Sequence, residues 1–153
     1  MSAPLPQNPD FEQTVRANFA RQQFMHTLGA KLARIAPGEV DIAMNFDAAL
    51  TQQHGFLHAG AITSIADSAC GYAALSLMPP NAEVLSVEFK VNLLAPARGE
   101  NFLAQGRVLK AGRTLTVCQG EVYVVEENGK RLIATMLATM IARAGGLSKQ
   151  AQN

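Results

Sequence analysis

A short stretch of the chain gathers polar residues that could hydrolyse an ester or a thioester. Asp67 lies in the middle of the mostly apolar segment 59–77, where a carboxylate has poor helix propensity and must be paired or neutralised if it is buried. Gln52, His54 and His58 precede it by fifteen residues or fewer. An unusual buried carboxylate is a candidate acid–base group. The simpler interpretation of Asp67 alone is a solvent-facing side chain or one bonded to a neighbouring loop.

The start of segment 59–77 adds hydrogen-bond donors to this set. If a helix begins after His58, the backbone N–H groups of Ala59 and Gly60 lack partners inside the helix and lie at the positive end of its dipole. Such groups polarise a carbonyl or stabilise an oxyanion. Gly60 also lets a ligand come close to the backbone, and the Gln52 amide could add a donor or hold a water. Polarising donors followed by a carboxylate suit ester or thioester hydrolysis.

The elements that position these residues indicate an α+β domain. Residues 59–77 predict one long apolar helix that ends before Pro79, and its many small residues let other elements pack closely. Short turns between the strands favour antiparallel pairing, so we expect a curved antiparallel sheet wrapped around the helix. The remaining expected elements are an N-terminal helix at 10–27, capped by Asp10, and strands near 28–36, 39–47, 85–93, 101–110, 113–125 and 131–142.

The chain is expected to form a single domain over residues 1–153, with a core at about 28–143 and a disordered tail at about 145–153. The strand at 39–47 alternates, which predicts Val40, Ile42, Met44 and Phe46 on one face. The first helix is expected to turn Phe11, Val15, Phe19 and Phe24 toward one side.

Composition argues against several other classes of protein. The formal net charge is +1 and no basic block is present, so neither nucleic acid nor a membrane surface is an expected partner. Residues 59–78 could just span a bilayer, but Asp67 at their centre makes a buried helix the better interpretation. The N-terminus does not resemble a signal peptide. Cys70 and Cys118 lack CxxC spacing and are expected to be reduced core residues of a cytoplasmic protein.

Residues 52–71, QQHGFLHAGAITSIADSACG, resemble the signature of the hotdog-fold thioesterases, in the branch that contains the phenylacetate-pathway thioesterases. That branch shows asparagine or glutamine, then HGG, then aspartate or glutamate on a central helix. Gln52, His58 and Asp67 match these positions in type and spacing, whereas Ala59 replaces the first glycine of HGG. The resemblance continues through LSVEFKVNLLAPARGE and GRVLKAGRTLTVCQGEVY and covers about residues 28–143.

The resemblance implies a role for each matching residue. Asp67 would be the general base that activates water, or the nucleophile that attacks the thioester carbonyl. The N–H of Ala59 would polarise that carbonyl, Gln52 would hold the carbonyl or the water, and His58 would orient the loop unless it is only a structural helix-entry residue. Ser86 would help to place the water, although it could equally be an ordinary strand residue. In the family, the carboxylate and the oxyanion donor come from different subunits, which implies a homodimer as the minimal active unit, with a homotetramer built as a dimer of dimers.

The resemblance also implies acyl-CoA as the substrate, with no metal and no redox cofactor. Gly60, Ser68 and Tyr72 are expected at the substrate. Tyr72, together with Leu75 and Met78, would suit a medium-chain or aromatic acyl group. Arg98, Lys110 and Arg113 could bind the CoA phosphates, since arginine matches phosphate geometry, although each could also be a solvated charge. His26 and His54 are expected to be plain surface or loop residues.

Two alternatives stay open. A hotdog hydratase or dehydratase would place a histidine and a carboxylate, such as His58 and Asp67, at the acyl chain, although the sequence HAGAITS lacks the proline-rich signature of dehydratases. A non-catalytic acyl-CoA-binding protein would use the same pocket without chemistry. Sensors of that kind carry a DNA-binding domain, for which the 27 residues before the first expected strand are too few.

Overall fold

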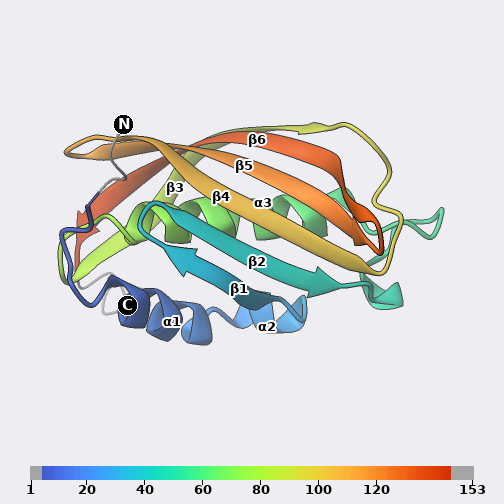
Figure 1. Ribbon diagram of the computed structural model, residues 1–153, viewed down its shortest axis with the longest axis horizontal. Helices are drawn as coiled ribbons and strands as arrows, with labels where there is room; N and C mark the ends of the chain where they lie inside the picture. The colour runs from blue at the N-terminus through green and yellow to red at the C-terminus, as the bar shows by residue number, and fades with distance from the viewer. Residues whose placement is uncertain (1–4, 146–153) are drawn as a thin grey trace, which may run out of the picture.

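The computed structural model describes residues 5–145. One curved antiparallel sheet wraps around helix α3, which lies along its concave face (Figure 1). The six strands lie side by side in the order β1-β2-β4-β5-β6-β3. This arrangement is the hotdog fold that the sequence predicts. The elements are α1 (Phe11–Arg21), α2 (Gln23–Thr27), β1 (Lys31–Ala36), β2 (Glu39–Asn45), the short 3-10 helix η1 (Ala48–Leu50), α3 (Ala59–Leu75), β3 (Ala82–Leu93), β4 (Asn101–Ala111), β5 (Leu115–Glu126) and β6 (Gly129–Ala144).

Helix α3 rests directly on the sheet because two glycines lie beneath it. Gly106 of β4 and Gly120 of β5 face each other across the two strands. A Cβ atom at Gly106 would lie 2.3 Å from the backbone carbonyl of Ala69, and one at Gly120 would lie 3.0 Å from the Cys70 Sγ. A side chain at either glycine position would therefore push the helix away from the sheet. The predicted close approach is confirmed, and it needs small residues on the sheet as well as on the helix.

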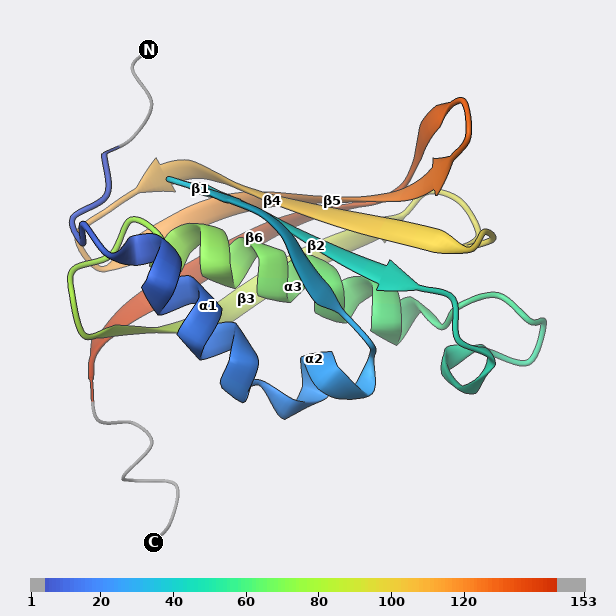
Figure 2. The same ribbon diagram turned by 60° about the horizontal axis from the view of Figure 1, so that its bottom comes forward.

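The N-terminal helix is not the single element predicted at 10–27. It breaks at Gln22, whose backbone is extended (φ −82°, ψ 91°), and α1 and α2 together lie along the side of α3 that the sheet leaves open (Figure 2). Phe19 and Met25 are both buried. Residues six apart lie on different sides of a continuous helix, so the break lets both reach the core. Phe24, predicted on the buried side, is 53% exposed, and Asp10 precedes α1 without a side-chain capping bond.

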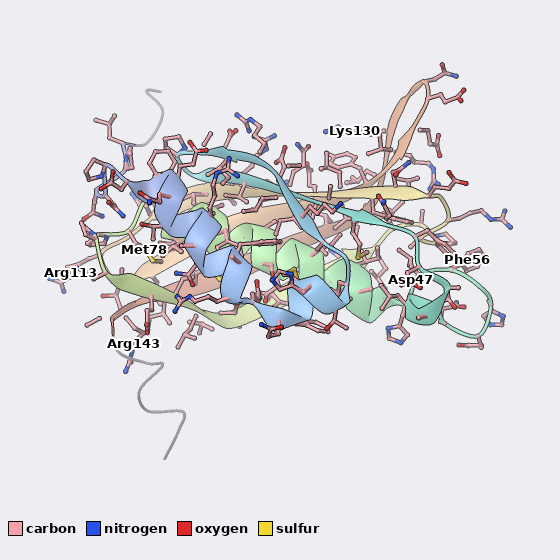
Figure 3. All side chains as sticks on the ribbon, turned by 90° about the horizontal axis from the view of Figure 1, so that it is seen from below. Asp47, Phe56, Met78, Arg113, Lys130 and Arg143 are labelled. Atoms are coloured by element: carbon pink, nitrogen blue, oxygen red, sulfur yellow. The ribbon has the colours of Figure 1, made fainter. Side chains whose placement is uncertain are left out.

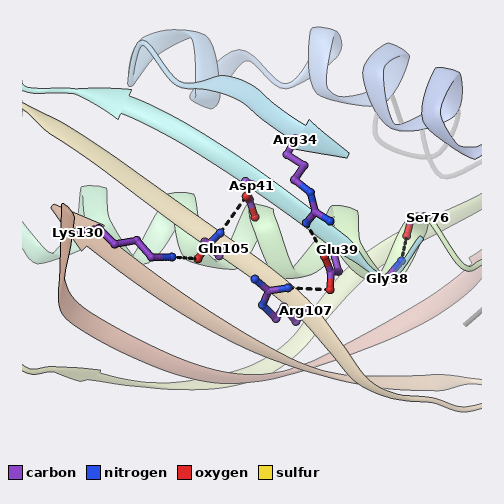
Figure 4. Close-up of polar contacts among 8 residues, drawn as sticks. All are labelled: Arg34, Gly38, Glu39, Asp41, Ser76, Gln105, Arg107 and Lys130. Carbon is purple, nitrogen blue, oxygen red and sulfur yellow. Dashed lines mark hydrogen bonds and ion pairs between the residues drawn. The ribbon is translucent and has the colours of Figure 1, made fainter. Parts of the chain in front are cut away.

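Other predicted boundaries shift by a few residues. Strand β1 begins at Lys31 because Gly29 turns the chain with φ +64°. Helix α3 ends at Leu75, where the Ser76 hydroxyl accepts the Gly38 N–H at 2.8 Å and donates to the Ala73 carbonyl. The bond from Gly38 to Ser76 ties the β1–β2 turn to the end of the helix (Figure 4). The tail predicted at about 145–153 lies, except for Gly145, outside the described residues.

The predicted alternation of the second strand holds for three residues of four. Val40, Ile42 and Met44 are buried against the core, whereas Phe46 lies beyond the end of β2 and is 41% exposed. The opposite face of the strand is polar. Figure 4 shows Glu39 between Arg34 and Arg107, and it forms an ion pair with each. The distance from the Arg107 guanidinium nitrogen to the Glu39 carboxylate oxygen is 2.7 Å. The two arginines lower the pKa of Glu39, chiefly through the hydrogen bond from Arg34.

A buried polar contact joins β2 to β4 on the same outer face. The Gln105 amide donates to Asp41 Oδ2 at 3.0 Å, and Lys130 donates to the Gln105 carbonyl oxygen at 2.5 Å (Figure 4). Asp41 is buried, and its second carboxylate oxygen has no hydrogen-bond partner. The outer face is therefore held together by polar contacts, in contrast to the apolar face that packs on α3.

Strand β3 is the outermost strand next to β6, and its pattern is broken by a bulge. Pairing with β6 shifts between Ser86 and Glu88, which leaves Val87 as an extra residue. Several large apolar side chains of this strand are exposed, by between 43% and 54%: Leu85, Val87, Phe89 and Leu93. The bulge therefore interrupts the regular alternation of the strand at Val87, and β3 carries an uncovered apolar edge.

Candidate active site

Asp67 lies midway along α3, half-buried and next to the edge strand. The Ser86 hydroxyl donates a hydrogen bond to Asp67 Oδ1 at 2.7 Å. Burial raises the pKa of Asp67, and the bond from Ser86 lowers it by less, so the net shift is upward. The structure thus brings together two residues that are nineteen positions apart in the sequence. The carboxylate is a stronger base than an ordinary aspartate, and the serine fixes its orientation.

A cavity of about 280 Å³ opens beside this pair. Asp67 and Ser86 line it together with Val84, and so does Gln22 at the α1–α2 break. There the Gln22 amide donates to Ser68 Oγ at 3.2 Å and accepts from the Tyr72 hydroxyl at 2.9 Å. Ser68 and Tyr72, predicted at the substrate, are therefore both at this cavity.

The sequence did not predict the three polar residues that line the cavity from the N-terminal helices and the break between them, namely Asn18, Arg21 and Gln22. They belong to the N-terminal helices, which precede the region covered by the family resemblance. Polar residues on an amphipathic helix usually face solvent, so their types alone carry no signal. Only the helix break, which brings Gln22 onto α3, reveals them.

His58 caps the N-terminus of α3. Its Nδ1 accepts the Gly60 N–H at 2.8 Å, and its own backbone N–H donates to the Leu50 carbonyl at 2.8 Å. The N–H of Gly60 is therefore already used. The ring bonds the start of the helix, and the His58 backbone makes the contact with Leu50. The N–H of Ala59 makes no hydrogen bond within residues 5–145. Ala59 thus offers the unpaired donor at the positive end of the helix dipole.

A larger cavity of about 600 Å³ lies at this end of α3. Gln52, His58 and Ala59 line it together with apolar residues such as Phe56 and Leu93. The Gln52 side-chain oxygen accepts the His54 N–H. Within the described chain the Gln52 amide nitrogen makes no hydrogen bond, so it remains available as a donor. The exposed His54 contributes only its backbone to this loop.

The predicted catalytic residues therefore form two half-sites in one chain. Ala59 and Asp67 lie on the same helix, eight residues apart, which separates them by about 12 Å along its axis. They line different cavities. A single thioester carbonyl cannot contact both groups within one subunit.

The predicted phosphate-binding cations do not meet in one chain. The Arg98 guanidinium lies over the Phe56 ring at 5.5 Å, at the edge of the larger cavity. Arg113 lies at the opposite end of the molecule, near Arg143 and Met78 (Figure 3). Lys110 is exposed near the end of β4 and lines none of the cavities described above. Arg98 alone is placed beside the half-site that contains Ala59.

Several other expectations concern residues away from the half-sites. Cys70 and Cys118 are buried and free; burial raises the pKa of both thiols, that of Cys118 to about 12, so neither is a reactive thiolate. His26 bonds the Ala20 carbonyl on the surface. Leu75 and Met78 pack in the core and do not line the cavity beside Asp67. Over residues 5–145, no three histidine, cysteine, aspartate or glutamate residues gather as a metal site would require.

A hotdog fold with a raised-pKa carboxylate on its central helix and an unpaired donor at the start of that helix is the arrangement that the signature predicts for a thioester hydrolase. Residues 54–129 match the model of the Thioesterase superfamily. The chain is 30% identical over 108 residues to a protein of Saccharolobus solfataricus named as an esterase, covering 71% of this chain and 75% of that one. The chain belongs to the thioesterase superfamily, as the signature predicts.

Solved structures agree with this assignment. A thioesterase family protein from Silicibacter pomeroyi is 54% identical, with a TM-score of 0.86 over 88% of this chain and 99% of that one. The E. coli PaaI protein of the phenylacetic acid degradation operon has a TM-score of 0.80 at 19% identity, over 91% of this chain and 97% of that one. This second likeness concerns the fold alone. Of the helices in the described part of the chain, none is long and apolar enough to span a membrane.

Proposed function

We propose that this thioesterase hydrolyses an acyl-CoA to the free acid and CoA, with Asp67 as general base or nucleophile. The observation that carries the proposal is the half-buried Asp67 carboxylate, hydrogen-bonded by Ser86 and shifted to a higher pKa, at the side of an open cavity. A carboxylate with a raised pKa accepts a proton from water more readily at neutral pH.

In the general-base mechanism, ionised Asp67 takes a proton from a water molecule that Ser86 helps to place. The resulting hydroxide attacks the thioester carbonyl carbon. Negative charge then develops on the carbonyl oxygen, where the Ala59 N–H and the Gln52 amide would stabilise it. Collapse of the tetrahedral intermediate breaks the C–S bond, and the departing thiolate takes the proton. In the nucleophilic alternative, Asp67 attacks the carbonyl itself, and water cleaves the mixed anhydride.

The separation of the half-sites supports a site shared by two subunits. Since Ala59 and Asp67 of one chain are about 12 Å apart along α3, we propose that Asp67 acts together with Ala59 and Gln52 of a second copy. The exposed apolar side chains of β3 provide a surface that pairing with a second copy would cover. A homodimer is thus the proposed active unit, and a homotetramer in the cytoplasm is the proposed assembly.

The proposed substrate carries its CoA arm in the cavity of about 600 Å³, where Arg98 can reach phosphate. A medium-chain or aromatic acyl group was inferred from Tyr72, Leu75 and Met78, of which only Tyr72 lines the cavity beside Asp67. The size and polarity of the acyl group therefore depend on the residues that line that cavity. The proposed chemistry uses only side chains, the Ala59 backbone N–H and water, without metal or redox cofactor.

The test is thiol release from a panel of short, medium, long and aromatic acyl-CoAs. Asp67→Asn keeps the shape of the side chain but removes its basicity, and a positioned base contributes about 10²–10⁴-fold. We expect turnover to fall by that factor, whereas Asp10→Asn, a surface change far from the cavities, leaves it unchanged. Retained turnover in Asp67→Asn would overturn its role. Binding of acyl-CoA without thiol release would instead favour a hydratase or a non-catalytic binding protein.

A further inference from the structure

The α1–α2 break brings side chains to Asp67 that thioester hydrolysis does not itself require. Gln22 is the residue at which the helix breaks, and its amide contacts both Ser68 and Tyr72 on α3. Ser68 directly follows Asp67 in the chain, and Tyr72 is buried one turn further along the same helix. The two hydrogen bonds fix the orientation of the Gln22 amide at the wall of the cavity.

Unused donors remain at this wall. After its bond to Ser68, the Gln22 amide has a second N–H available. Neither Asn18 nor Arg21 makes a side-chain hydrogen bond or ion pair within residues 5–145. Arg21 lies close enough to Tyr72 that its positive charge acts against the effect of burial, which raises the pKa of that phenol to about 12. The part of the cavity that the N-terminal helices line is thus rich in donors and carries a positive charge.

An apolar acyl chain would be a poor occupant of this cavity. Contact with hydrocarbon would remove water from these donors without replacing their hydrogen bonds, which is unfavourable. An acyl group that carries an oxygen function would satisfy them instead. Because Asp67 and Ser86 line the same cavity and would act on the carbonyl, this oxygen belongs to a part of the acyl group beyond the carbonyl.

The two cavities differ in size, which indicates which part of the substrate each of them holds. The volume of the cavity beside Asp67, about 280 Å³, is less than half that of the cavity near Ala59, and it falls just below the range of about 300–1,000 Å³ of sites for drug-sized ligands. The long pantetheine arm and its nucleotide need the larger cavity. A short acyl group fits the smaller one.

We propose that the cavity beside Asp67 binds the acyl group, and that Gln22 and Arg21 select a short acyl group with a hydroxyl or carboxylate at its far end. This inference rests on the proposed acyl-CoA thioesterase function. Gln22 is a specificity-determining residue that contacts the acyl group, while Tyr72 and Ser68 hold its amide in position. Arg21 adds preference for an anionic end.

The experiment compares hexanoyl-CoA with its ω-hydroxylated form and with adipoyl-CoA, which have the same chain length. We expect the wild-type kcat/KM to be about tenfold or more higher for the two polar substrates, because one satisfied hydrogen bond is worth roughly that factor. Gln22→Leu should remove the preference for the ω-hydroxylated substrate and reduce that for adipoyl-CoA, which Arg21 still favours. Arg21→Gln should lower only the preference for adipoyl-CoA, which distinguishes a carboxylate from a hydroxyl.

Matched controls are available on the same helices. Gln23→Leu changes an exposed neighbour of Gln22, and Arg16→Gln changes an exposed arginine of α1 that pairs with Glu12. Neither should alter the ratio of kcat/KM values. Tyr72→Phe removes a single hydroxyl and should weaken the preference without unfolding the protein. It therefore tests the role of the Gln22 amide even if Gln22→Leu does not fold.

Each other result contradicts the inference. Equal or higher activity on hexanoyl-CoA would show that the cavity does not select a polar end. A preference for the ω-hydroxylated substrate that survives in Gln22→Leu would place recognition elsewhere. A KM raised equally for all three substrates in Arg21→Gln would mean that this cavity holds the CoA arm. Absence of thiol release from these three substrates, with turnover of other acyl-CoAs in the panel, would overturn this inference alone. Absence across the whole panel would overturn the proposed function as well.

Discussion

The two sides of helix α3 differ in how they are covered. On the sheet side, Gly106 and Gly120 let the helix backbone approach the strands, and the contact is apolar and tight. On the open side, Gln22 joins the helix through two polar side-chain bonds and leaves a cavity of about 280 Å³. Close packing on one side fixes where Asp67 lies, and the loose polar contact on the other side leaves room for a ligand. The same helix thus combines rigid support with an accessible carboxylate.

The largest effect is expected from Gly106→Ala on the tight side. The new Cβ would lie 2.3 Å from the backbone of Ala69, and backbone cannot move aside as a flexible side chain can. Overpacking usually costs about 1–3 kcal/mol, and this clash should cost at least that. Thermal unfolding would show a strongly lowered Tm or no folded protein. An unchanged Tm would show that α3 does not depend on close contact with β4.

The next effect concerns Ser86 at the edge of the open side. Activity that needs ionised Asp67 is lost as pH falls through the pKa of that carboxyl, which burial raises above its ordinary value. Ser86→Ala removes the hydrogen bond that opposes this rise, so the acid limb of the kcat/KM profile should move to higher pH. Turnover at neutral pH should fall by about tenfold, the value of one hydrogen bond. A pH profile identical to wild type would contradict the pairing of Ser86 with Asp67.

A smaller effect is expected in the stability of Asp67→Asn. Because the folded state raises the pKa of Asp67, the folded protein binds its proton more tightly than the unfolded chain does. The contribution of Asp67 to the free energy of folding is therefore favourable at acid pH and is lost as pH rises through the raised pKa. Asp67→Asn should be more stable than wild type at neutral pH, and the difference should shrink toward acid pH. Denaturant unfolding at several pH values measures this, and a variant less stable than wild type at neutral pH would contradict it.

The smallest effect is expected from Gly71→Ala on the open side, which is the matched control for Gly106→Ala. A Cβ atom at Gly71 meets nothing within 4 Å. Alanine is the better helix former, so the variant should be more stable by about 0.5–1 kcal/mol. Since Gly71 lines the cavity beside Asp67, bulkier acyl groups should show a modestly raised KM. Destabilisation by Gly71→Ala as large as that by Gly106→Ala would remove the distinction between the two sides.

The same contrast explains what the sequence could predict. The signature around Asp67 and the apolar, small-residue character of α3 predict the family, the fold and the position of the carboxylate, because both are encoded locally. The family resemblance implied that Ser86 helps to place the water, but the bond from Ser86 to Asp67 was not predicted. It depends on where β3 lies relative to α3, and this distance in space cannot be read from residue spacing.

The helix break at Gln22 was not predictable in the same way. Residues 10–27 have a helical pattern throughout, and the break exists because Phe19 and Met25 must both reach the core. Such a demand comes from tertiary packing, which overrides local preference. The glycines beneath α3 were missed for a related reason, since a glycine within a strand does not show which backbone will lie against it.

The extra residue at Val87 determines which charge lies near Asp67. In β6, Met140 and Ala138 point toward the helix. Met140 pairs with Ser86 and Ala138 pairs with Phe89. Ser86 and Phe89 therefore both face α3, although they are three positions apart. Glu88 pairs with Thr139 on the other face and accepts its hydroxyl hydrogen bond. In a regular strand, residues two apart share a face, so Glu88 would follow Ser86 inward. The bulge therefore keeps a second negative charge away from the carboxylate, and like-charge repulsion does not add to the upward shift of its pKa.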